Sequence, residues 1–415
     1  MKAKITEVCQ RNGQPTEVVD LLLKIAEDSG GYQFAKVHSL CYSKITAWTL
    51  YLKIKHPIVF YWANLRMART EKANKHEKLA MIEREMRMDG YRLLPPDLLR
   101  SDLDFKIEDD KSIRYALGMI RGIDKSAQKL EAFRAVGGGG LRDEYGVVTS
   151  NKFQLFQALK NAGLNVGVSS SLIQAGCLEG FGKSRCRLVL ELLTYGLLTD
   201  REKTICLTIG SHPDVNWDVL NAIVYLRDHT DENGKPLFSR KTRFDTIKKK
   251  YAQYEEIYHL NRRNEPLCNY WYERTVLGYS YSATIKDIFS KETDGLVSIR
   301  AAREMVSGEH VRLIGFVKEP FKQKTKAGND GFKMTLVDET DEITVRFFNH
   351  KIEACERVNG RLPQESDLCL IDGEVKDASC VFADRVGLPS AKIFMKLSDL
   401  KSEGDRKSAE LASPI

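Results

Sequence analysis

The sequence has no long apolar run. None of its uninterrupted apolar stretches approaches the ~20 residues that a membrane-spanning helix needs. The segment from Met1 to Lys24 mixes acidic and basic side chains and contains no apolar core of the kind found in a secretion signal. These absences exclude a membrane-spanning helix, and we expect a cytoplasmic protein.

Metal-ligand spacings are also absent. The nine cysteines are scattered without a Cys-x-x-Cys pair, and no two of the eight histidines lie three or four residues apart. Zinc sites and helical metal pairs are usually recognised by these spacings. We therefore expect reduced, mostly buried thiols and no metal site in this chain.

The composition fits a folded protein of several modules. The 415 residues are 42% hydrophobic and 29% charged, which is sufficient for about two to four packed modules. Lys and Arg outnumber Asp and Glu by 64 to 57, which gives a formal net charge of +7. This mild basic excess favours a polyanionic partner, although many proteins that bind no nucleic acid share it.

A basic aromatic segment near the N-terminus is the first functional signal. Residues 31–38 read Gly-Tyr-Gln-Phe-Ala-Lys-Val-His, and the side chains that follow at spacings of three and four predict one face of a helix. Lys36 and His38 lie in its first turn and Lys44 lies further along. Their side chains could contact a triphosphate or a DNA backbone. A core helix whose lysines extend into solvent is the alternative.

This segment resembles the fingers segment of bacterial DNA polymerase III alpha subunits, the C-family replicative polymerases. That family carries a Gly-Tyr-Gly-Phe-Asn-Lys-Ser-His stretch, then an Ala-rich helix that ends in Leu-Lys and a proline. The chain keeps Gly31, Tyr32, Phe34, Lys36, His38, Tyr42, Thr49, Leu52, Lys53 and Pro57 and departs at Gln33, Ala35 and Val37. The resemblance implies that Lys36, His38 and Lys44 approach the phosphates of an incoming nucleotide.

Later segments resemble the same family in the same order. A Leu-Pro-Pro-Asp turn stands at residues 94–97, and a short hairpin is expected near 105–115. Between them, Asp102-Leu103-Asp104 has the spacing of a metal-binding pair in a two-metal nucleotidyl transferase. A solvated acidic loop is favoured instead, because Asp prefers the surface and the family's catalytic aspartates lie in a palm domain upstream of the fingers.

Two helix-hairpin-helix motifs are expected after this turn. In the first, at 117–136, Gly122 forms a tight turn from which backbone N–H groups could reach a DNA phosphate. Asp124 stands where the family has a second glycine, and an acid there would repel a phosphate. A purely structural hairpin is therefore the alternative.

The second hairpin, at 172–188, resembles the family's Leu-Ile-x-Ala-Gly-Ala-Phe-Asp-x-Leu-Gly-x-x-Arg stretch. Its glycines favour a tight turn, and the basic residues after it would give a positive face for a duplex backbone. The residues expected to contact DNA are Gly180, Gly182, Lys183, Arg185 and Arg187. Taken alone, a Gly-Phe-Gly turn is more often a helix cap.

From His310 onward the hydrophobicity alternates with period two. Three strands, a short helix and two more strands are expected, which is the order of an oligonucleotide-binding (OB) barrel. The first loop combines basic charge with aromatic rings, as binding of single-stranded DNA requires. The expected contacts are Phe316, Lys318, Phe321, Lys322, Lys324 and Lys326. Phe316 could equally be a core residue, and small barrels also bind proteins and sugars.

We therefore expect a multidomain α+β protein, mostly helical in its N-terminal two-thirds and ending in a small OB barrel. The expected parts are a fingers-like helical segment with a small hairpin at 1–115, a tandem helix-hairpin-helix at 116–200, a helical connector at 201–305, the barrel at 306–400 and a disordered tail at 401–415.

The resemblance runs from about Gly31 to about Leu397 and implies the C-terminal part of a C-family polymerase. Nothing matches the family's phosphoesterase-like domain, its thumb, or its palm with the metal-binding aspartates. We therefore expect no catalytic residue and no bound cofactor in this chain, and magnesium in a palm supplied from elsewhere.

The first hypothesis is accordingly one half of a split DNA-directed DNA polymerase. Its expected partners are primed template, single-stranded template, a palm-bearing polymerase polypeptide, the sliding clamp and other replisome subunits, although no complete clamp-binding peptide occurs in the sequence. The alternatives are a non-catalytic DNA-binding or replisome scaffold protein derived from a polymerase, and a truncated, inactive remnant.

Overall fold

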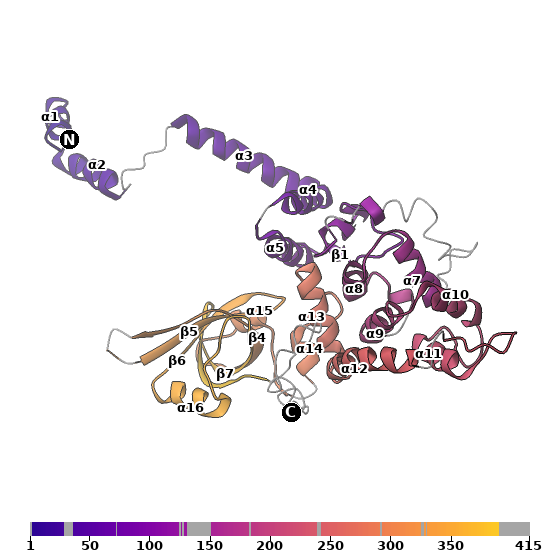
Figure 1. Ribbon diagram of the computed structural model, residues 1–415. Helices are drawn as coiled ribbons and strands as arrows, with labels where there is room; N and C mark the ends of the chain where they lie inside the picture. Colours follow the sequence, from indigo (N-terminus) through magenta and orange to yellow (C-terminus); the bar gives the residue numbers. More distant parts are fainter. Residues whose placement is uncertain are drawn as a thin grey trace. The chain divides into compact units, whose positions relative to one another are not determined.

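The structure is a computed structural model that describes residues 2–28, 36–71, 73–123, 126, 128–130, 151–181, 184–238, 242–290, 293–324, 328 and 330–389. The chain divides into two compact units, Met1–Tyr61 and Trp62–Ile415. Figure 1 shows the elements in chain order. Within the described ranges, no helix is long and apolar enough to cross a membrane.

The first unit contains α1 (Lys2–Arg11), α2 (Thr16–Asp28) and α3 (Lys36–Lys55). α1 and α2 pack together and bury Cys9 and Val19. On α3, every residue from His38 to Leu52 is exposed. The exposed apolar side chains of α3 are Leu40, Tyr42, Ile45, Trp48, Leu50, Tyr51, Leu52 and Ile54. α3 thus exposes large apolar side chains along its length, and near its end the Lys53 ammonium lies 5.7 Å from the ring centroid of Tyr61 on α4 (Pro57–Thr70).

The second unit opens with helices against a small sheet. After α4 (Pro57–Thr70) and α5 (Lys75–Met88), the strands β1 (Arg92–Leu94), β2 (Lys106–Asp109) and β3 (Ser112–Arg114) pair in the order β1-β3-β2. β2 and β3 are antiparallel, so the predicted hairpin is confirmed. The indole Nε1 of Trp62 donates a hydrogen bond of 2.8 Å to the carbonyl of Phe105, which ties α4 to the segment entering β2.

A run of helices follows, and side-chain caps mark where several begin. Asn151, Asn165, Ser184, Thr199 and Asp218 each accept a hydrogen bond from an N–H that has no partner inside its helix. The elements are η1 (Leu117–Met119), α7 (Lys152–Asn161), α8 (Val166–Gln174), η4 (Glu179–Phe181), α9 (Arg185–Tyr195), α10 (Asp200–Ile209), α11 (Val219–Asp228), α12 (Arg243–Arg262), α13 (Glu265–Leu277), α14 (Ile285–Phe289) and α15 (Ile299–Arg303).

α13 lies at the centre of this unit. Its Cys268 and Tyr272 pack with Cys186, Leu190 and Tyr258 of α9 and α12. Its Leu267 and Tyr270 pack with a second cluster formed by Ile285, Phe289, Leu296, Ile314, Phe316 and Leu368. No residue from Leu267 to Ser280 is exposed. Because apolar groups cover both flanks, α13 is a buried helix that joins the helical region to the barrel.

The C-terminal part is a closed barrel with the strand order β4-β5-β6-β8-β7 (Figure 1). The elements are β4 (His310–Lys324), β5 (Asp330–Val337), β6 (Glu342–Phe348), α16 (His350–Asn359), β7 (Leu368–Asp377) and β8 (Cys380–Gly387). Alternate residues such as Met334, Leu336 and Val345 fill the interior, and α16 adds Ile352 and Cys355. This architecture confirms the predicted fold class.

A bulge in β4 reverses which residues face outward. Lys318 pairs with Thr335 and Phe321 pairs with Lys333, so three steps on β4 match two on β5. The extra residue lies at Glu319–Pro320, where Glu319 has φ of 52°. Thr335 and Lys333 share the outward face of β5. The bulge therefore places Phe321 on the outside of the barrel, whereas strict alternation from Val317 would turn it inward.

The barrel core yields a stability prediction. Leu336→Ala removes a fully buried side chain, whereas Val358→Ala changes one that is 77% exposed on α16. The first should lower the free energy of unfolding by about 2–5 kcal/mol because it leaves a cavity, and the second by less than about 0.5 kcal/mol. Chemical denaturation of both variants measures the difference, and equal losses would contradict the assigned interior.

Candidate nucleic-acid interface

The residues predicted to contact a nucleotide lie on α3. Lys36 is the first residue of α3, and His38 and Lys44 are exposed on its following turns. His38 packs edge-on against Tyr42, with 4.5 Å between ring centroids. α3 carries four lysines and one histidine and no acidic residue. It therefore presents a basic surface interleaved with aromatic side chains.

The first predicted hairpin keeps its tight turn. Gly122 lies in this turn with φ of +88°, a backbone conformation that residues with a Cβ rarely adopt. A Cβ at this position would lie 3.3 Å from the hydroxyl of Ser171 on α8, so the turn packs closely on that helix. Asp124, the acid expected to repel a phosphate, lies outside the described residues.

A further helix–turn–helix occurs where the sequence reading placed none. α7 ends at Asn161, Gly163 turns the chain with φ of +75°, and the side chain of Asn165 caps α8 through the N–H of Val168. The ammonium of Lys129 donates to the carbonyl of Gly163 at 2.9 Å, which joins the second half of the first hairpin to this turn. The signal that could have revealed it is the Gly-Leu-Asn run between two amphipathic segments.

The second predicted hairpin connects α8 to α9. Gly180 belongs to the short helix η4 between them, whereas Gly182 and Lys183 lie outside the described residues. Gly176 precedes η4 with φ of +82°. A Cβ on Gly176 would lie 1.9 Å from the Tyr281 hydroxyl and 2.9 Å from the Arg185 guanidinium, so only glycine fits there.

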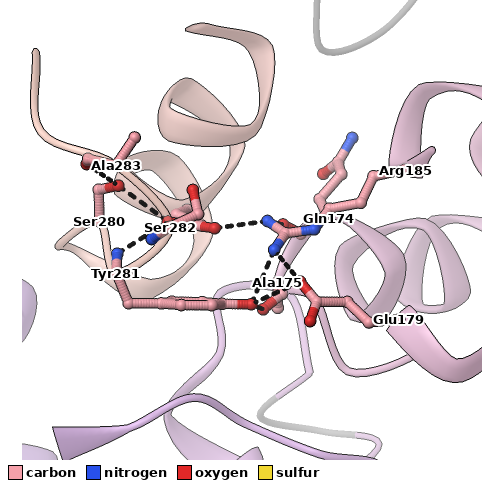
Figure 2. Close-up of polar contacts among 9 residues, drawn as sticks. Gln174, Ala175, Glu179, Arg185, Ser280, Tyr281, Ser282 and Ala283 are labelled. Carbon is pink, nitrogen blue, oxygen red and sulfur yellow. Dashed lines mark hydrogen bonds and ion pairs between the residues drawn. The ribbon is translucent and has the colours of Figure 1, made fainter. Parts of the chain in front are cut away.

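Arg185 is buried rather than exposed to DNA. Its side chain is 8% exposed, and its Nη1 donates to the Glu273 carboxylate at 2.6 Å. Its Nη2 donates to the Tyr281 hydroxyl at 2.8 Å and also to the carboxylate of Glu179. Figure 2 shows the guanidinium between η4 and the segment 280–283. Burial opposes the charge of Arg185, but Tyr281 and the carboxylates outweigh burial and raise its pKa.

Glu273 completes this network from α13. Its carboxylate is fully buried, and its second oxygen accepts hydrogen bonds from the N–H groups of Tyr281 and Ser282 and from the Ser280 hydroxyl, at 2.8 to 3.0 Å. A buried carboxylate of this kind needs a cation and full hydrogen bonding. Arg185, Glu179, Glu273 and Tyr281 thus form one polar network, and the carbonyl of Gln174 lies 3.5 Å from Arg185 Nη1 as a further acceptor.

Arg187 also has internal partners. Its guanidinium donates to Glu191 at 3.0 Å and to Asp218 at 2.8 Å, while 31% of its side chain remains exposed. Burial again opposes the charge, and the two carboxylates raise the pKa of Arg187. Arg185 and Arg187, the two described cations of the positive face predicted after the second hairpin, are thus engaged in ion pairs within the protein.

The barrel residues predicted to bind DNA separate into two groups. Phe316 is 7% exposed and stacks on Tyr270 at 6.0 Å between centroids, so it occupies the core position left open as an alternative and cannot stack on a base in this arrangement. Phe321 is 45% exposed, and Lys318 and Lys324 are exposed as well. The ammonium of Lys322 contacts Glu356 at 3.2 Å. Lys326 lies outside the described residues.

Strand pairing places the predicted Phe321 beside three functional candidates that the sequence did not reveal, Lys333, Arg346 and Phe382. Phe321 pairs with Lys333, Lys333 with Arg346, and Arg346 with Phe382, across β4, β5, β6 and β8. We call these four residues the aromatic–basic row. The ammonium of Lys333 lies 5.5 Å from the Phe321 ring centroid, and Phe348 packs edge-on against Phe382 at 5.6 Å. The members lie far apart in sequence, so local spacing could not reveal them.

The acidic pair near the first strands has structural partners. Asp104 accepts from Arg66 at 2.8 Å and lies 3.4 Å from Arg69, and Asp102 lies 3.7 Å from Lys106. These carboxylates therefore serve ion pairs at the surface. Within the described ranges, no cluster of three His, Cys, Asp or Glu side chains could hold a metal ion.

Most of this chain is similar to part of the DNA polymerase III alpha subunits of several bacteria. The DNA polymerase III alpha subunit of Thermus aquaticus is 25% identical over 364 residues, which is 87% of this chain and 26% of that protein. Its counterpart in Pseudomonas aeruginosa is 23% identical over 89% of this chain and 29% of its own length. The Aquifex aeolicus subunit is 28% identical over 46% of this chain and 15% of its own length. The chain thus spans about a quarter of the first two relatives.

Solved structures add a weak likeness. The telomere capping protein Ten1 from Saccharomyces pombe is 17% identical with a TM-score of 0.17, over 23% of this chain and 82% of that chain. That score is too low to support an argument about fold or function.

A family model described as a helix-hairpin-helix motif matches residues 90–188. The match runs from β1 to the start of α9 and includes the turns at Gly122, Gly163 and Gly176. It confirms a helix-hairpin-helix in this part of the chain. Together with the alignments over 87% and 89% of its length, this motif shows that the protein resembles the bacterial DNA polymerase III alpha subunits.

Proposed function

We propose that this chain supplies the DNA-holding part of a replicative DNA polymerase whose palm is carried by another polypeptide. The similarity to DNA polymerase III alpha subunits over nearly nine-tenths of the chain carries this proposal. The helix-hairpin-helix and the aromatic–basic row of the barrel are the elements that would hold the DNA.

Single-stranded template would lie across the aromatic–basic row. Rings of Phe321 and Phe382 offer faces on which bases stack, and Lys333 and Arg346 lie between them for the phosphates. Stacking tolerates any base sequence, as template passage requires.

The duplex part of a primed template would contact the helix-hairpin-helix through backbone groups. The turn at Gly122 brings the chain into a conformation from which N–H groups can approach a phosphate. Arg185 and Arg187 would support this contact indirectly, because their guanidinium groups are held by Glu273, Glu191 and Asp218.

α3 supports the need for a partner polypeptide. At 100° per residue, its exposed apolar side chains lie around the whole circumference of the helix. Large apolar side chains of this number are normally covered, and an isolated helix of this length is marginal in water. A palm-bearing polypeptide would enclose α3, with Lys36, His38 and Lys44 directed toward the incoming nucleotide.

Magnesium chemistry would belong to the partner. Two magnesium ions held by palm carboxylates activate the primer hydroxyl in polymerases of this type. The Asp102 and Asp104 carboxylates do not fit this task, because lysine and arginine side chains pair with them. The role of this chain would therefore be to bind and orient DNA and nucleotide.

A non-catalytic DNA-binding scaffold is the second candidate. It is favoured by the internal ion pairs of Arg185 and Arg187, which engage both described guanidinium groups after the second hairpin. Under this reading the barrel would still bind single-stranded DNA, but α3 would have no nucleotide to contact.

Single-strand binding can be tested on the barrel. Phe382→Ala should weaken binding of an oligo-dT probe by about tenfold, because one base loses its stacking surface. Val358→Ala, on the exposed side of α16, should leave the affinity unchanged. Fluorescence anisotropy at fixed salt measures both variants, and the same affinity in the Phe382 and Val358 variants would argue against the row as the binding surface.

Nucleotide contact can be tested on α3. In the presence of a palm-bearing polypeptide from the same genome, the chain should extend a DNA primer, and Lys44→Ala should slow incorporation by about tenfold or more. Lys55→Ala, at the far end of the same helix, serves as the matched control. If the chain and the palm-bearing polypeptide together extend no primer, the polymerase hypothesis is contradicted. If Lys44→Ala leaves the affinity for DNA unchanged in that case, the scaffold hypothesis remains.

A further inference from the structure

Two adjacent residues of α13 contact different parts of the second unit. Glu273 binds Arg185 of α9 and thereby holds the helix-hairpin-helix. Arg274 donates to the hydroxyl of Tyr270 at 3.1 Å, and its guanidinium lies 4.5 Å from the ring centroid of Phe316 on β4. One turn of α13 is therefore bonded to the helix-hairpin-helix on one flank and to the barrel on the other.

Arg185 contacts three segments of the second unit: α13, η4 and the loop between α13 and α14. Besides Glu273, it contacts Glu179 of η4 and Tyr281 in the loop that leads to α14. α14 in turn contacts β4 and places Ile285 and Phe289 in the core beside Phe316. A single buried guanidinium thus connects the turn of the second hairpin to the loop between α13 and α14 (Figure 2).

The fit around Arg185 is close. The Tyr281 hydroxyl also donates to the carbonyl of Ala175 at 3.3 Å, directly before Gly176. Because a Cβ on Gly176 would overlap Tyr281 and press on Arg185, the loop and the turn approach each other only where glycine stands. The side chains of Tyr281 and Arg185 are therefore closely packed against Gly176, and a closely packed interior tolerates little change in shape.

We propose that Arg185 is a positioning residue: by clamping the turn 174–181 to Glu273 and Tyr281, it sets the orientation of the helix-hairpin-helix relative to the barrel, so that one primed DNA engages both. The DNA part of this proposal rests on the proposed function. The alternative, direct contact of Arg185 with a phosphate, conflicts with its 8% side-chain exposure.

The orientation itself can be measured without DNA. Spin labels at Val166→Cys on α8 and Val358→Cys on α16, in a Cys41→Ser background, report the distance between hairpin and barrel. Arg185→Met should broaden the distance distribution. Arg243→Met, which removes an ion pair with Glu202 elsewhere in the helical region, should leave it narrow. An unchanged distribution in Arg185→Met overturns the proposal.

Milder variants keep the test decisive if Arg185→Met fails to fold. Tyr281→Phe removes one hydroxyl and should broaden the same distribution to a smaller extent. Gly176→Ala should also broaden it, whereas Gly234→Ala, at a glycine with a similar positive φ (+75° against +82°) but open space around the Cβ, should not. Equal behaviour of the two alanine variants would contradict a steric lock at Gly176.

DNA binding supplies the functional readout. Three probes are compared by anisotropy: oligo-dT, a duplex, and a duplex with a single-stranded template extension. Arg185→Met should lose about tenfold in affinity for the extended duplex while oligo-dT binding is unchanged, because the barrel remains intact and only the coupling is lost. Equal losses on all three probes would overturn the positioning role. If the wild type binds none of them, the proposed function fails, and the spin-label distances alone decide the orientation.

Discussion

The ion pair between Arg185 and Glu273 is the interaction on which the second unit depends. A carboxylate with no exposed surface is tolerated only because a guanidinium and three further donors surround it. Removing one partner of such a buried pair costs about 3–5 kcal/mol, since the other charge stays buried without compensation. α13 can therefore carry the buried carboxylate of Glu273 between two modules, because Arg185 on one side and residues 280–282 on the other supply its hydrogen-bond donors.

The barrel shows a different constraint, in which pairing geometry assembles the surface. Phe321, Lys333, Arg346 and Phe382 come from four adjacent strands and meet because these strands pair in this order and register. The bulge at Glu319 is part of this arrangement, because it brings Phe321 to the outward face. The proposed single-strand site thus follows from topology rather than from one motif.

Much of the fold was predictable from the sequence, and much of the site was not. Period-two alternation after His310 predicted the barrel, and the turn residues around Gly122 and Gly180 predicted the hairpins, because these signals are local. Local signals do not report long-range partners. Arg185 therefore had the spacing of a DNA contact, although Glu273 lies 88 residues further on. Phe316 stands beside the basic first loop in the sequence and was therefore expected to contact DNA, yet it packs against α13.

The two-sided burial of α13 has a consequence for dissecting this protein into pieces. A barrel fragment that begins at His310 would uncover Ile314 and Phe316, which rest on α13 in the intact chain. A helical fragment that ends after α13 would uncover Leu267 and Tyr270 instead. Either cut exposes adjoining apolar side chains to water, a surface prone to aggregation. Soluble truncations should therefore retain α13 together with both of its neighbours.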